Sequence, residues 1–129
     1  MESYDTMMDQ PSMRALVEAV RNFLETRAMP ELEGHTAFHA RVAANALAIV
    51  ARELDLAPKS DTQELERLKA LLDRDGTLLE LNRELCRRLR SGEVTLATPR
   101  LATHLEQTTR DKIAIDQPTY SGLAINRTL

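Results

Sequence analysis

The chain of 129 residues has a single cysteine, Cys86, no tryptophan and only four glycines. One cysteine excludes an internal disulfide, which fits the reducing cytoplasm. Aromatic residues make up 3% of the chain, so a core must consist mostly of leucine, alanine, valine and isoleucine. The sequence contains neither a glycine-rich phosphate loop nor a kinase signature. We therefore expect no kinase activity in this chain, and no cofactor is indicated.

Basic charge is not in excess either, because 17 lysines and arginines are set against 20 acids, for a net charge of −3. Nucleic-acid binding relies on basic surfaces that neutralise phosphates, so it is not expected. The N-terminal residues 1–6 are acidic and polar, which is the opposite of a signal peptide. The apolar stretch 35–54 approaches the length of a membrane span, but it contains charged residues. We expect a cytoplasmic protein without a membrane partner.

The stretch 35–54 is the longest strongly apolar run, and it is rich in alanine without glycine or proline. At about 100° per residue, Phe38, Val42 and Ile49 share one stripe. A separate face carries small side chains: Ala37, Ala40, Ala44, Ala48 and Ala51. A helix that is apolar on most sides is usually buried on most sides. The pattern predicts an all-α domain of about five helices packed around this central helix.

Capping residues and prolines predict the helices on either side of it. Ser12 is a suitable cap for a first helix over 13–28, which Pro30 ends. Pro58 is expected to break the central helix, so that a third helix runs over 61–73.

Two further helices complete the expected domain. Thr77 is predicted to cap the fourth helix, and Gly92 is predicted to follow its end. The fifth starts at Thr98 with a proline in its first position, and it ends before Pro118. The expected organisation is a flexible arm at 1–11, a helical domain at 12–118 and a C-terminal tail at 119–129.

Three stretches resemble an uncharacterised bacterial helical family, a domain of unknown function. They are residues 37–50, 84–93 and 112–120, and the resemblance extends over roughly residues 12–121. Members of that family are encoded beside, or fused to, aminoglycoside-phosphotransferase-like kinases, and near acyl-CoA dehydrogenases. The resemblance implies a bacterial origin, a helical fold and an accessory role beside such an enzyme. It implies no catalytic residues.

Polar side chains along one edge of the central helix are the candidate ligand site. Arg41, Asn45 and Arg52 lie on this edge, and His39 is close to it. Two arginines in one pocket suit a carboxylate or a phosphate. The alternative, which we favour, is a structural network in which the arginines pair with acids such as Glu18, Glu25 or Asp116.

A metal site is a weaker candidate. His35 and His39 are four residues apart, so both can lie on one helical face. A third ligand would have to come from Glu33, His104 or Asp111. No His-Glu-x-x-His motif is present, so we predict no metal site.

The fourth predicted helix carries the densest basic cluster: Arg83, Arg87, Arg88 and Arg90. Glu80 and Glu84 lie three and four residues from these arginines, so ion pairs on a solvated face are expected rather than a phosphate site. Cys86 flanks an apolar stripe and is expected to be a buried, unreactive thiol.

These observations favour a non-catalytic interaction or accessory domain, with a protein partner that is either a second copy or a neighbouring kinase-like or acyl-CoA-handling enzyme. A homodimer through an apolar helix face is compatible with this function. The alternative is a domain that binds a small carboxylate or phosphate ligand beside the central helix.

Overall fold

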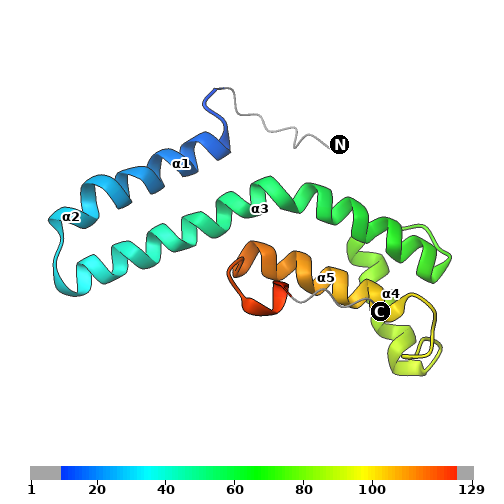
Figure 1. Ribbon diagram of the computed structural model, residues 1–129. Helices are drawn as coiled ribbons and strands as arrows, with labels where there is room; N and C mark the ends of the chain where they lie inside the picture. Colours follow the sequence, from blue (N-terminus) through cyan, green and yellow to red (C-terminus); the bar gives the residue numbers. More distant parts are fainter. Residues whose placement is uncertain (1–9, 125–129) are drawn as a thin grey trace. The chain divides into compact units, whose positions relative to one another are not determined.

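The computed structural model describes residues 10–124, and every regular element among them is helical (Figure 1). The predicted all-α class is therefore confirmed. The elements are α1 (Met13–Phe23), the π-helical η1 (Leu24–Ala28), α2 (Met29–Glu31), α3 (Gly34–Leu72), α4 (Leu78–Ser91), α5 (Leu101–Asp116) and the 3₁₀ turn η2 (Ser121–Ala124). Within residues 10–124, no helix combines the length and the apolar character needed to cross a membrane.

The chain divides into two compact units, and α3 contributes to both. Unit 1 is Met1–Ala57 and unit 2 is Pro58–Leu129. Parts of the expected arm and tail, residues 1–9 and 125–129, lie outside the described residues. The division into arm, domain and tail stays a prediction.

Unit 1 is a helical hairpin in which α1 runs antiparallel to the first part of α3 (Figure 1). Ser12 caps α1 as predicted, because its hydroxyl accepts a hydrogen bond from the N–H of Ala15 at 3.1 Å. Arg14, at the start of α1, donates from Nε and Nη2 to the two carboxylate oxygens of Asp55 at 2.8 and 3.0 Å. This pair joins the two arms of the hairpin.

Within residues 10–57, the buried side chains of unit 1 are all alanines, and they lie on α3: Ala40, Ala44, Ala51 and Ala57. The larger apolar side chains on the same part of α3 are not buried, since Phe38, Val42 and Val50 are 44–55% exposed. The prediction of a central helix buried on most sides is therefore wrong for this part of α3. Among the described residues 10–57, the hairpin places one long helix, α1, along α3, and it covers a single face of α3.

The predicted break at Pro58 is absent, because Pro58 lies inside α3. Asp61 and Glu64, in the first turn of the third helix expected over 61–73, are therefore in the helix interior. The predicted helices over 35–54 and 61–73 form one element of 39 residues, which corrects the count of five helices. Proline removes one backbone hydrogen bond, but leucines on both sides of it continue the helical pattern into a packed core.

Unit 2 holds the leucine core of the protein, which is formed by Leu68, Leu72, Leu81, Leu85, Val94 and Leu101. Burying each of these side chains contributes about 1.5–3 kcal/mol. Thr77 caps α4 as predicted, with its hydroxyl accepting from the N–H of Glu80 at 3.2 Å. Gly92 follows the end of α4 in the left-handed conformation, with φ of 82°.

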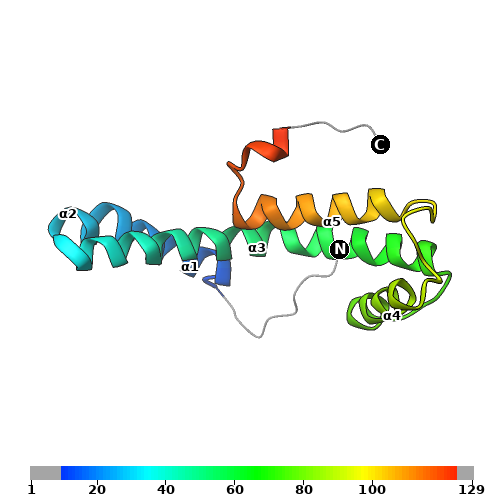
Figure 2. The ribbon, with the colours of Figure 1, turned by 90° about the horizontal axis from the view of Figure 1, so that it is seen from below.

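The last helix, α5, begins later than predicted. Thr98 does not cap it; the Thr98 hydroxyl instead accepts from the N–H of Thr95 at 2.9 Å. The helix starts at Leu101, directly after Arg100, whose φ is 71°. It ends at Asp116, before Pro118, as predicted. Figures 1 and 2 both show α5 alongside the second part of α3.

Candidate functional site

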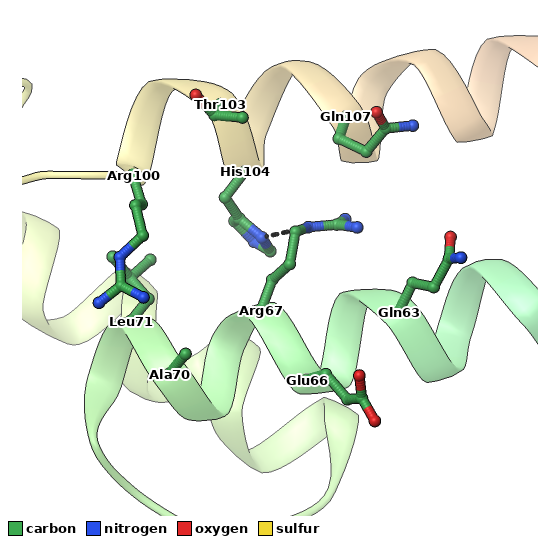
Figure 3. A pocket seen from close by; sticks show the side chains of 9 residues that line it. All are labelled: Gln63, Glu66, Arg67, Ala70, Leu71, Arg100, Thr103, His104 and Gln107. Atoms are coloured by element: carbon green, nitrogen blue, oxygen red, sulfur yellow. Dashed lines mark hydrogen bonds between the residues drawn. The ribbon is translucent and has the colours of Figure 1, made fainter.

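A pocket of about 590 Å³ lies between α5 and the part of α3 that belongs to unit 2 (Figure 3). Its position follows from the leucine core, which holds the two helices together at the end where α5 begins. The lining residues are Gln63, Glu66, Arg67, Ala70, Leu71, Arg100, Thr103, His104 and Gln107.

Arg67 and His104 face each other across this pocket (Figure 3). Arg67 Nε donates a hydrogen bond to His104 Nδ1 at 3.1 Å, and Nη2 donates to the hydroxyl of Thr108 at 3.1 Å. Since Nδ1 accepts, the neutral imidazole carries its proton on Nε2. Burial and the positive charge of Arg67 both lower the pKa of His104 below its ordinary value of 6.5.

The charge of the pocket is positive. Across residues 10–124, no ion pair joins Arg67 or Arg100 to a carboxylate. The acid of the lining, Glu66, points away from the gap between the helices, whereas Arg67 and Gln63 point into it (Figure 3). Ala70 and Leu71 add apolar surface. The arrangement combines guanidinium donors with an apolar wall, which suits an organic anion.

The residues proposed from the sequence lie elsewhere. His39, Arg41 and Asn45 are exposed on α3, Arg52 is half-buried there, and none of the four lines the pocket. The ring of His39 packs edge-on against Phe38, with 5.6 Å between ring centroids. A ligand-binding role for these four residues stays a prediction.

Two of the three acids expected to pair with the central helix, Glu18 and Glu25, are engaged within α1 and η1. Glu18 pairs with Arg14 and Arg21, and Glu25 pairs with Arg21. For the weak metal candidates, the described part of the chain holds no group of three His, Cys, Asp or Glu side chains arranged to bind an ion.

Two of the four arginines in the basic cluster on α4, Arg87 and Arg88, form ion pairs, and both pair with Glu84. Its carboxylate lies 2.8 Å from Arg87, 2.9 Å from Arg88 and 3.3 Å from Arg74. Hydrogen bonds from Arg87 and Arg88 lower the pKa of Glu84 to about 2. Cys86 on the same helix is exposed, so the expectation of a buried thiol was wrong.

A second candidate surface lies on unit 1 and consists of exposed apolar side chains, which we name the unit 1 apolar surface. On α1, Leu16, Val20 and Phe23 are 43%, 51% and 57% exposed, with spacings of four and three residues. On α3, Phe38 and Val42 are also about half exposed. Spacings of three and four place side chains in one stripe along a helix.

The sequence pattern of each single helix did not predict this pocket, because its lining comes from two helices that pair in the folded protein. Gln63, Arg67 and Leu71 are spaced by four residues on α3. Arg100 directly precedes α5, and His104 and Gln107 follow on that helix at spacings of four and three residues. The available signal was the matching helical spacing of these two sets of residues, but their pairing depends on tertiary structure.

The comparisons with known proteins give a family without an assigned activity. The family model of a domain of unknown function, DUF6285, matches residues 30–120, which is more than half of the chain. No curated protein and no solved structure matched. The match covers all of α3, α4 and α5 and includes every residue of the pocket. The chain therefore belongs to the DUF6285 family.

Proposed function

We propose that this protein is a helical interaction domain whose unit 1 packs against a helical partner. The observation that carries the proposal is the contrast between the two kinds of apolar side chain in unit 1. Its buried residues are alanines, whereas larger side chains such as Val20, Phe23 and Phe38 are more than half exposed.

An amphipathic helix is stable when its apolar stripe is covered. A single hairpin covers only the face between its two arms, and here that face is small because the side chains are alanines. Covering one large apolar side chain contributes about 1.5–3 kcal/mol. A second pair of helices would cover the stripes of α1 and α3 together, which is the arrangement of a four-helix bundle.

The partner that we propose is a second copy of the chain. Two identical hairpins present the same surface to each other, which is the commonest way in which homodimers form. The other partner consistent with the family resemblance is a neighbouring kinase-like or acyl-CoA-handling enzyme, for which the domain would be an accessory.

The test measures the mass of the full chain in solution by sedimentation or light scattering. We expect a dimer, and we expect a Val20→Glu, Phe38→Glu variant to be monomeric with its helical circular dichroism retained. Leu96→Glu is the control, because Leu96 is 85% exposed in unit 2. If the parent protein is monomeric and a co-expressed kinase-like enzyme captures it through the same surface, that enzyme would replace the second copy as the partner. A monomer that captures neither would overturn the proposal.

A further inference from the structure

We propose that the pocket between α3 and α5 is a binding site for a small organic oxyanion, whose carboxylate or phosphate group binds Arg67 and whose apolar body lies against Ala70 and Leu71, with Arg100 adding positive charge at the end where α5 begins. The site lies wholly within unit 2, so it is independent of the interaction surface on unit 1. Its volume of about 590 Å³ is typical of sites for small molecules.

Arg67 is held in place by neutral groups. Its two hydrogen bonds go to the imidazole of His104 and the hydroxyl of Thr108, and neither partner neutralises the guanidinium. A guanidinium has five N–H donors, so these two bonds leave donors for a ligand. Both partners lie on α5, and side chains fixed between two helices are well placed to bind without reorganisation.

Arg67 differs in this respect from three other half-buried arginines. Arg14 pairs with Asp55, Arg21 pairs with Glu25, and Arg88 pairs with Glu84. A half-buried cation without a carboxylate is unfavourable unless an anion is supplied. An oxyanion bound in the pocket would supply it, and the fork of the guanidinium matches a carboxylate or a phosphate in two parallel bonds.

His104 is a positioning residue for Arg67. It is 3% exposed and accepts from Arg67 Nε, so a neutral ring orients the guanidinium without adding a second charge to be compensated. Burial and the charge of Arg67 keep its pKa below the ordinary value, which preserves this acceptor at neutral pH.

Arg100 brings the second charge to the end of the pocket where α5 begins. It precedes α5 in the left-handed conformation, with φ of 71°, which is uncommon for a residue other than glycine. Strained backbone of this kind is concentrated at ligand sites. Its side chain extends from the start of α5 toward Leu71 on α3 (Figure 3). The first backbone N–H groups of α5 add positive potential at the same end.

The apolar wall restricts the class of anion. Leu71 and Ala70 provide no hydrogen-bonding side chain, and the amide groups of Gln63 and Gln107 lie at the opposite end of the pocket (Figure 3). A compact, fully polar anion would leave this wall in contact with water. We therefore expect a monocarboxylate or a phosphate monoester that carries a hydrocarbon part.

The experiment titrates the full chain by calorimetry with hexanoate, phenyl phosphate and inorganic phosphate, and with hexanamide as the uncharged match for hexanoate. We expect hexanoate or phenyl phosphate to bind and hexanamide not to bind. Binding of phenyl phosphate with competition by inorganic phosphate would assign a phosphate group, and binding of hexanoate alone would assign a carboxylate.

Variants connect the binding to the two arginines. Arg67→Met and Arg100→Met are each expected to weaken binding about tenfold or more, because the first removes the donor that binds the oxyanion and the second removes a positive charge from the same pocket. Arg83→Met is the matched control, since Arg83 is exposed on α4 outside the pocket. Arg100 is itself exposed and outside the leucine core, so its variant keeps the test valid if Arg67→Met unfolds. Failure of both anions to bind, or equal binding by Arg100→Met and the parent protein, would overturn the proposal.

Discussion

Arg88 donates a hydrogen bond from Nη1 to the backbone carbonyl of Leu72 at 3.0 Å, which links the last turn of α4 to the last residue of α3. The final carbonyl groups of a helix have no partner within the helix, and a cation near them is favourable. Arg88 is in turn held by Glu84 at 2.9 Å. The polar side of α4 therefore stabilises the end of α3 directly beside the leucine core, in which Leu72 itself takes part.

Replacing Arg88 by methionine should lower the free energy of unfolding by about 1–2 kcal/mol, because the Leu72 carbonyl loses a charged donor. Arg83→Met on the same helix is the control, and its effect should stay within about 0.5 kcal/mol. Urea unfolding of the two variants and the parent protein measures the difference. Equal midpoints for Arg88→Met and Arg83→Met would show that the bond contributes nothing.

Acid should destabilise the protein through Glu84. The pKa of this carboxyl is about 2 in the folded protein and 4.5 ordinarily, so the unfolded chain binds its proton first as the pH falls. The contribution of Glu84 is therefore fully present above about pH 4.5 and is lost as the pH falls toward 2. Thermal unfolding across this range should show a shallower loss of stability for Glu84→Gln than for the parent protein. Parallel curves would contradict the ion-pair network around Glu84.

A second pH effect is expected from His104. The pKa of His104 is below 6.5 in the folded protein, so the unfolded chain binds this proton more readily and protonation of the imidazole favours unfolding. Stability is then complete above about pH 6.5 and falls below it, by at most about 1.4 kcal/mol per pH unit. Arg67 is the charged group that the ring contacts, and Arg100 lines the same pocket. His104→Gln should remove this slope, whereas His35→Gln, on exposed His35 of unit 1, should retain it; equal slopes for both would refute the assignment.

Pro58 is expected to weaken α3, because it lies inside the helix and lacks a backbone N–H. Alanine is favoured over proline in a helix interior by about 3 kcal/mol, and the greater freedom of the unfolded variant offsets about 1 kcal/mol of that gain. Pro58→Ala should therefore raise the free energy of unfolding by about 1–2 kcal/mol. Pro99→Ala, in the segment before α5, is the control and should not stabilise the protein. A drop in stability for Pro58→Ala would argue against a continuous helix at this position.

Local signals in the sequence were sufficient for the ends of several helices. Ser12 and Thr77 cap α1 and α4 as predicted, because a cap depends on a side chain and a backbone N–H only a few residues apart. Gly92 ends α4 for a similarly local reason, since the left-handed conformation suits glycine. These features needed no knowledge of what packs nearby.

Features that depend on tertiary packing were not predictable in the same way. Pro58 favours a helix end locally, but α3 continues because leucines beyond it enter a core. Phe38 and Val42 have the pattern of buried residues, and their exposure depends on how many helices surround α3 in unit 1. The pocket around Arg67 required the pairing of two helices that are separated by α4 in the chain.

The alanine core of unit 1 has a consequence for α3 as a helix. Its first part is held by small side chains and its second part by fully buried leucines such as Leu68, so one continuous helix carries two different local stabilities. Local opening is easiest where few apolar contacts are lost. The backbone amides of residues 34–57 should therefore exchange their hydrogens with the solvent well before those of residues 58–72, and the helix should fray inward from Gly34 while its end at Leu72 stays closed.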